Sequence, residues 1–171
     1  IGYVPQKAVM FRGTVGSNVG YGDNGNVRAD IKEIKTAVRI AQGTEFVEKM
    51  DGQYDAEIAQ GGTNVSGGQK QRLAIARAVY RKPEIYIFDD SFSALDYKTD
   101  RILRTVLKKE TAGVTSLIVA QRIGTIMDAD QIIVLEEGRM VGKGTHKELL
   151  NTCDVYREIA MSQLSEEELI S

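Results

Sequence analysis

The fold is decided by the stretch Asn64-Val65-Ser66-Gly67-Gly68-Gln69-Lys70-Gln71-Arg72. Ser66 and Gln69 have the spacing of a capping box, which predicts that a helix begins here and continues to about Arg81. Two glycines at a helix start leave backbone N–H groups bare, and the helix dipole adds partial positive charge. The start of this helix is therefore a candidate anion site, with a plain helix cap as the alternative.

A buried strand is predicted directly after this helix. The apolar run Ile85-Tyr86-Ile87-Phe88 is typical of a strand buried on both faces of a parallel sheet, and it ends in Asp89-Asp90. A carboxylate at such a strand end can hold Mg²⁺, directly or through water. A turn or capping role for these aspartates is the alternative.

Further strands and helices alternate along the rest of the chain. A helix is predicted from about Tyr97 to Glu110, and buried strands at 116–120 and 132–135, the first of which ends at Gln121. Glu137-Gly138 predicts a hairpin turn, and a helical region is expected over about 147–164. This order predicts an open α/β fold with a parallel sheet that binds ligands outside the carboxyl ends of its strands.

The front of the chain is predicted to be Gly-rich and then helical. Asp30 and Glu33 have the spacing of a second capping box, and a loop is expected over 54–63. The first residues, from Ile1, resemble a strand already in progress, and the chain does not begin with Met. We therefore expect the sequence to be part of a longer protein.

Composition excludes several classes of protein. The chain has 171 residues, 42% of them hydrophobic and 27% charged, as is usual for one globular domain. A formal net charge of −2 gives no basic surface for nucleic acid. A single cysteine, Cys153, excludes an internal disulfide, and its helical neighbours predict a packing role. The one histidine, His146, is expected at the surface, at a helix start.

Taken together in this order, the motifs resemble those of ATP-binding cassette (ABC) ATPases, from Ile1 to about Leu164. The stretch from Asn64 to Arg72 resembles the signature sequence, and Ile85 to Asp89 the Walker B strand. The remaining matches are Gln6 in the Q-loop, Ser93, Ala94, Leu95 and Asp96 in the D-loop, and Gln121 at the position of the switch histidine. The resemblance implies a P-loop NTPase core with a parallel sheet plus an α-helical signature subdomain.

The resemblance also implies roles, with ATP and Mg²⁺ as cofactors. Asp89 and Gln6 would bind Mg²⁺, and the catalytic positions would be held by Gln6, Asp90 and Gln121. The signature residues would contact ATP held by a second nucleotide-binding domain; they are Ser66, Gly67, Gly68 and Gln69. The expected division is a helical subdomain over about 7–82, a core over 83–164 and a tail over 165–171.

The subtype is suggested by the loops that flank these motifs. Gln60-Gly61-Gly62 before the signature, and the segment from Val134 to His146, look like bacterial exporter-type nucleotide-binding domains. In that group a transmembrane domain is fused upstream, and the nucleotide-binding domains pair head to tail at the cytoplasmic face of the membrane. A soluble ABC ATPase is the alternative, but the short span from Gln6 to Ser66 argues against it. No Gly-x-Gly-x-x-Gly follows a strand, which argues against a dinucleotide-binding domain.

Three departures from the family pattern bear on activity. The sequence contains no Gly-x-x-x-x-Gly-Lys-Ser/Thr loop, which in the family lies upstream of the Q-loop, so we expect the chain alone to bind ATP poorly and not to hydrolyse it. Asp90 stands where a glutamate is usual, and its carboxylate is withdrawn by roughly 1.5 Å, one C–C bond. Gln121 replaces a histidine and cannot carry a proton.

These departures weaken one nucleotide site and leave the signature intact. They predict the degenerate-site subunit of a heterodimer, whose signature serves the competent site of its partner. A regulatory half that binds ATP with little hydrolysis of its own is the alternative reading of the same two residues, Asp90 and Gln121.

Overall fold

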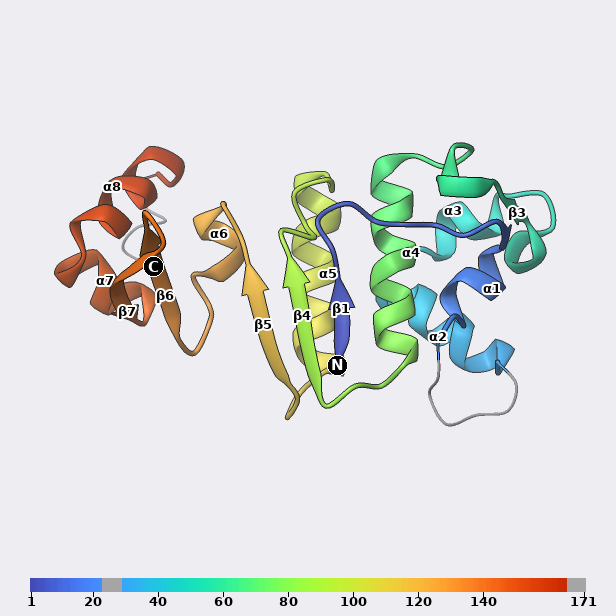
Figure 1. Cartoon of the computed structure of the whole chain (residues 1–171), viewed down its shortest axis with the longest axis horizontal. Coiled ribbons are helices and arrows are strands. Elements are labelled where there is room, and N and C mark those ends of the chain that lie inside the picture. Colours follow the sequence, from blue (N-terminus) through green and yellow to red (C-terminus); the bar gives the residue numbers. More distant parts are fainter. Residues whose placement is uncertain (23–28, 166–171) are drawn as a thin grey trace. The chain divides into compact units, whose positions relative to one another are not determined.

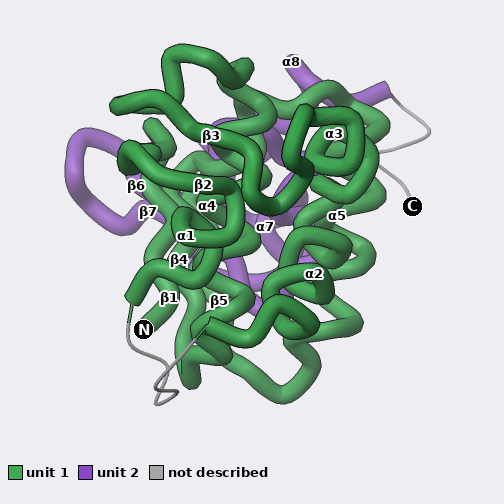
Figure 2. The backbone as a smooth tube through the Cα atoms, turned by 90° about the vertical axis from the view of Figure 1, so that its right-hand side faces the viewer, with its two compact units in different colours: residues 1–119 green, residues 120–171 purple. Residues whose placement is uncertain are grey.

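The computed structural model describes residues 1–22 and 29–165 of the chain. The chain divides into two compact units, Ile1–Val119 and Ala120–Ser171, which are coloured separately in Figure 2. Among the described residues, no helix combines the length and apolar character needed to cross a membrane.

The first unit contains a three-stranded parallel sheet with the order β1-β4-β5 (Figure 1). Its strands are β1 (Gly2–Val4), β4 (Ile85–Asp89) and β5 (Thr115–Val119), which confirms the predicted parallel α/β arrangement. On one face, Tyr86 and Phe88 join a buried cluster with Leu103 and Leu107 of α5 (Tyr97–Glu110). This helix has the bounds that the sequence predicts.

The other face of this sheet differs from the prediction. Leu117 and Val119 of β5 are 54% and 49% exposed, so the expectation of a strand buried on both faces is wrong for β5. Side chains alternate between the two faces along a strand, so Leu117 and Val119 share a face with Tyr3, whereas Ile118 on the opposite face is half-buried. The apolar run therefore predicted the strand correctly, but it did not reveal that one face of the strand is exposed.

The helical part of the first unit packs around α4 (Gly67–Tyr80), which begins where the capping box predicts. Around it lie α1 (Val15–Val19), α2 (Ile31–Ile40) and α3 (Thr44–Glu48). The predicted loop over 54–63 contains short regular elements: 3₁₀ turns at Gln53–Asp55 and Gln60–Gly62, and β3 (Glu57–Ile58), which pairs with β2 (Gly13–Thr14).

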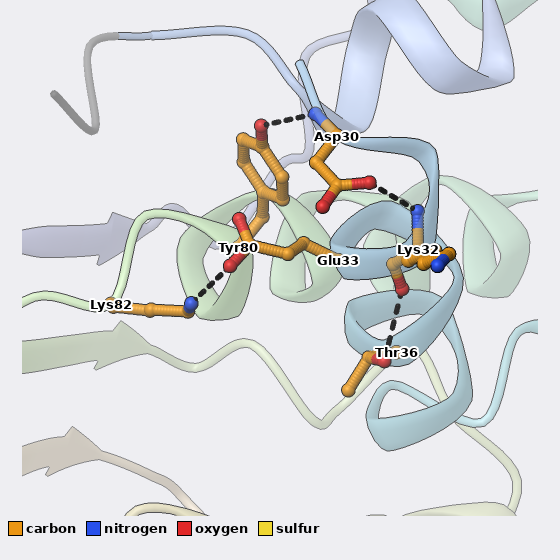
Figure 3. Close-up of polar contacts among 6 residues, drawn as sticks. All are labelled: Asp30, Lys32, Glu33, Thr36, Tyr80 and Lys82. Atoms are coloured by element: carbon orange, nitrogen blue, oxygen red, sulfur yellow. Dashed lines mark hydrogen bonds and ion pairs between the residues drawn. The ribbon is translucent and has the colours of Figure 1, made fainter. Parts of the chain in front are cut away.

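Polar contacts tie α2 to the end of α4 (Figure 3). The Tyr80 hydroxyl accepts a hydrogen bond of 3.2 Å from the backbone N–H of Asp30, and Asp30 Oδ1 accepts one of 2.8 Å from the N–H of Lys32. Thr36 Oγ1 donates to the carbonyl of Lys32 at 3.0 Å. Glu33 pairs with Lys82 instead of reaching back to Asp30, so Asp30 is the N-cap as predicted but the capping box is wrong.

The second unit consists of a hairpin and short helices. They are α6 (Ile123–Ile126), β6 (Ile132–Glu136), β7 (Arg139–Gly144), α7 (His146–Thr152) and α8 (Asp154–Gln163). The predicted turn is confirmed, with positive φ at Glu137 (48°) and Gly138 (76°). β6 pairs antiparallel with β7 in a separate two-stranded sheet, as the predicted hairpin requires. Ile133 and Leu135 are 53% and 67% exposed, so the expectation of a buried strand at 132–135 is wrong for that face. The single helical region expected over 147–164 is divided at Cys153, whose φ of −129° is extended.

His146 and Cys153 both belong to the core of the second unit. Cys153 is 5% exposed, which confirms its packing role. His146 is also 5% exposed, so the expectation of a surface histidine is wrong. Its Nδ1 lies 2.7 Å from the hydroxyl of Tyr156, which is itself buried. From the sequence, a helix start with Thr145 as N-cap is expected to be exposed to solvent. In the structure, α7 packs on α8, and this packing buries the His146 side chain.

Candidate nucleotide site

Asp89 and Asp90 stand at the carboxyl end of β4. Asp89 is the last residue of the strand, and Asp90 follows it with φ of 45°, in the left-handed region. A non-glycine residue held there costs on the order of 1–3 kcal/mol, and such strain persists only where the surroundings fix it. Here the backbone N–H of Asp90 donates a 2.8 Å hydrogen bond to the carbonyl of Val119, which holds the turn against β5.

Gln6 lies at the same edge of the sheet, because β1 runs parallel to β4 with Val4 opposite Phe88. Gln6 Nε2 donates a hydrogen bond of 3.1 Å to Asp90 Oδ2. The structure therefore brings together two residues that are 84 positions apart in sequence and that the sequence motifs assigned to one site.

Tyr3 is a neighbour of this site that the sequence motifs did not indicate. Its hydroxyl donates a 3.0 Å hydrogen bond to Asp89 Oδ2, and this bond raises the pKa of the Tyr3 phenol. The contact follows from the register of the two strands. Tyr3 pairs with Ile87, so Tyr3 and Asp89 project from the same face of adjacent strands. Finding it required knowing which strands pair.

The donor set at this edge suits Mg²⁺. Within residues 1–22 and 29–165, no group of three or more His, Cys, Asp or Glu side chains could hold a metal ion. Mg²⁺ does not need such a cage, because it is usually bound by one or two carboxylates together with water and substrate phosphates. The adjacent carboxylates of Asp89 and Asp90 fit that requirement.

The start of α4 has the geometry that its sequence predicts. Ser66 Oγ accepts a hydrogen bond of 3.2 Å from the N–H of Gln69, and Gln69 Oε1 accepts one of 2.8 Å from the N–H of Ser66. The two glycines between them differ. A Cβ on Gly67 would meet no atom within 4 Å, so the backbone there is open to an approaching group.

The D-loop residues lie beside this helix start. A Cβ on Gly68 would be 3.4 Å from the carbonyl oxygen of Ala94 and 3.7 Å from the side chain of Leu95. Ser93 Oγ donates a 2.8 Å hydrogen bond to the carbonyl of Asp90. Asp96 caps α5 through a 3.0 Å hydrogen bond from the N–H of Thr99, and this bond lowers the pKa of Asp96.

Gln121 belongs to the other compact unit, Ala120–Ser171. Its backbone carbonyl accepts a 2.9 Å hydrogen bond from Gln163 Nε2 within that unit. The structure thus brings Gln6, Asp89 and Asp90 to one sheet edge and the signature next to the D-loop, whereas Gln121 belongs to the second unit.

Comparison with known proteins assigns the fold and motifs to a family. Residues 1–93 match the model of the family described as ABC transporter. The chain is 47% identical over 163 residues to an uncharacterized ABC transporter ATP-binding protein of Mycobacterium tuberculosis, covering 95% of this chain and 28% of that protein. It is 40% identical over 163 residues to ATP-binding cassette sub-family B member 5 of Homo sapiens, covering 95% of this chain and 13% of that protein.

A solved structure agrees with these sequence relatives. The fold matches the structure of a bacterial Atm1-family ABC exporter with ATP bound, with a TM-score of 0.89, 36% identity and coverage of 96% of this chain and 29% of that chain. The chain therefore belongs to the ABC transporter family, and it is a nucleotide-binding domain of the exporter type. It spans less than a third of the length of these relatives.

Proposed function

We propose that this chain is the ATP-binding part of a longer ABC exporter and forms the degenerate-site subunit of a heterodimer. In this assembly the chain presents Ser66, Gly67, Gly68 and Gln69 to ATP held by the partner's nucleotide-binding domain. The observation that carries the proposal is an asymmetry: the signature has an intact capping box and an open backbone at Gly67, whereas Asp90 and Gln121 replace the usual catalytic residues.

The chemistry assigned to the chain's own site is correspondingly weak. Bound Mg²⁺ would neutralise charge on the ATP phosphates, and Asp89 would hold it with Gln6 alongside. Asp90 would orient a water, but its carboxylate is one methylene shorter than glutamate and is engaged by Gln6. Displacement of a catalytic group by about 1 Å can cost on the order of 10²-fold in rate.

The longer protein would carry a transmembrane domain upstream and hold this domain at the cytoplasmic face of a bacterial membrane. The relatives named above support this placement, since they are ABC transporter proteins and an exporter of much greater length. Within this domain, the proposal divides the chain into a helical subdomain (about 7–82), a core (83–164) and a tail (165–171). Export is proposed as the direction of transport, and ATP hydrolysis as its driving reaction.

The proposal is tested by restoring the two catalytic positions in the longer protein together with its partner. Asp90→Glu with Gln121→His should raise ATP turnover at this chain's own site, measured in an assembly whose other site is inactivated. The matched control is Asp89→Asn in the same background, which removes the Mg²⁺ carboxylate and should abolish the gain. Unchanged turnover after restoration would refute a degenerate own site.

The signature is tested separately. Gly67→Asp places a carboxylate where a phosphate would bind and should strongly reduce turnover at the partner's site. Because a Cβ at Gly67 meets no atom within 4 Å, the substitution introduces charge without a clash. If ATP turnover at the partner's site survives Gly67→Asp, the signature of this chain does not contribute to that site.

For the chain alone we expect no ATP hydrolysis. A clear rate of hydrolysis by the purified chain that Asp89→Asn abolishes would contradict that expectation.

A further inference from the structure

Gln71 is a buried polar residue of α4 that lies within the signature stretch but is not among the residues expected to contact ATP. It is 2% exposed, and it lies two residues after Gln69, the last residue of the capping box. Its Nε2 donates a 3.0 Å hydrogen bond to the carbonyl oxygen of Pro5, which is 66 positions away in sequence. A buried amide is retained only when it has partners, so the position of this bond is informative.

The bond falls on the segment that leads from β1 to Gln6. Within it, the carbonyl of Val4 accepts a 2.8 Å hydrogen bond from Ser91 Oγ, and Ser91 is fully buried directly after Asp90. The carbonyl of Pro5 accepts from Gln71. The next residue, Gln6, donates to Asp90 Oδ2. Three successive residues are therefore fixed by side-chain hydrogen bonds to either α4 or the end of β4.

We infer that Gln71 is a positioning residue that holds the Pro5 carbonyl and thereby keeps the Gln6 amide on Asp90. It joins the helix that starts at the signature to the carboxylate of the chain's own nucleotide site. A displacement of α4 moves the Pro5 anchor, and with it the Gln6 amide. This inference rests on the proposed function for its catalytic consequence, but its structural part does not.

The structural part is tested on the chain itself by NMR of the Gln6 side-chain amide, assigned by its loss in Gln6→Ala. Gln71→Met keeps a buried side chain of similar volume and removes the donor. We expect the Gln6 amide resonance to move toward its position in Asp90→Ala, which removes the acceptor. The matched control is Asn18→Leu, which removes another buried amide, 1% exposed, that bonds to Phe11 and Thr14 instead of Pro5. An unmoved Gln6 resonance in Gln71→Met overturns the inference.

The catalytic part is tested by a double-mutant cycle in the longer protein carrying Asp90→Glu and Gln121→His. Gln71→Met should lower kcat by about tenfold to a hundredfold with little change in KM for ATP. If Gln71 acts through Gln6, adding Gln71→Met to the Gln6→Ala variant should not lower kcat any further. For the control, the fold-changes in kcat caused by Asn18→Leu and by Gln6→Ala should multiply in the double variant. If the fold-changes in kcat caused by Gln71→Met and by Gln6→Ala multiply in the double variant, the inference is overturned.

The two tests separate this inference from the proposed function. If the restored protein shows no turnover at its own site, the proposed function fails and the NMR experiment still decides the role of Gln71. If Gln71→Met does not fold, Gln71→Asn replaces it in both tests, because it keeps an amide in the site but withdraws the donor from Pro5 by one methylene.

Discussion

His146 is held as a neutral imidazole in the core of the second unit. Burial is the largest cause that lowers its pKa, the positive charge of Lys147 adds to it, and the negative charge of Asp128 opposes it. A histidine whose pKa is lower in the folded state takes up protons more readily when unfolded. Its contribution to stability is therefore complete above its ordinary pKa of about 6.5 and is lost as pH falls through that value toward the folded pKa.

The prediction is that acid destabilises the second unit through His146. Between pH 7.5 and 5.5 the chain should lose more thermal stability than the His146→Leu variant, with about 1.4 kcal/mol for each unit by which the pKa is lowered. Thermal unfolding followed by circular dichroism at several pH values measures this. Parallel pH profiles for the two proteins would show that His146 does not titrate during unfolding.

At the residue scale, the sequence predicted which side chains lie together only where the order of strands along the chain determines their positions. Asp89, Asp90 and Gln6 follow predicted strands, and the carboxyl ends of parallel neighbours meet at one edge, as the Gln6–Asp90 bond illustrates. The Tyr3–Asp89 and Gln71–Pro5 bonds could not be predicted in this way. They depend on strand register and helix rotation, which arise from packing between segments far apart in the sequence.

At the element scale, α4 holds the first unit together through Arg77. Its Nε donates to the carbonyl of Asn18 at 2.7 Å and its Nη1 to the carbonyl of Val9 at 3.0 Å, while its guanidinium lies over the ring of Phe11 at 5.2 Å. Burial lowers the pKa of Arg77. The fork geometry of a guanidinium, which lysine lacks, makes both bonds possible.

We expect Arg77→Lys to lower the free energy of unfolding by about 1–3 kcal/mol, because the carbonyl of the buried residue Asn18 loses its guanidinium donor. Chemical denaturation of the chain measures the change. The control is Arg81→Lys at the exposed C-cap of the same helix, which should change stability by less than about 0.5 kcal/mol. Equal losses in the two variants would contradict a specific role for Arg77.

The hairpin of the second unit shows what local sequence can and cannot predict. Glu137-Gly138 indicated the turn because it lies between apolar runs, and a two-residue turn fixes the pairing of β6 with β7. The apolar run of β6 did not reveal that Ile133 and Leu135 lie exposed on one face, because a run of this kind is equally typical of a strand buried on both faces.

The same turn contains a residue, Glu137, whose replacement should stabilise the hairpin. Glu137 has φ of 48°, a conformation that asparagine adopts more readily than glutamate. Glu137→Asn should raise the free energy of unfolding of the second unit by about 0.5–1 kcal/mol, measured by thermal unfolding. Glu136→Asn, one residue earlier and within β6, should give no such gain, and an equal gain there would mean that the turn conformation is not the cause.

At the scale of the whole chain, the exposed side of the parallel sheet dominates the expected behaviour in solution. This apolar sheet face is defined by Tyr3, Ile85, Leu117 and Val119, which are 55%, 40%, 54% and 49% exposed. Contiguous apolar surface of this kind favours association. Within the described residues, β1 and β5 also each have one edge without a strand partner, which offers backbone groups for pairing with another chain.

The chain should therefore self-associate, and charge on this face should prevent it. Leu117→Lys with Val119→Lys places two like charges on the apolar sheet face and should shift the chain toward monomer in sedimentation velocity over a range of concentrations. Leu135→Lys is the matched control, because Leu135 is 67% exposed but belongs to the hairpin of the other unit. A monomeric wild-type chain at every concentration would contradict the prediction, and an equal effect of Leu135→Lys would show that net charge, not this face, controls association.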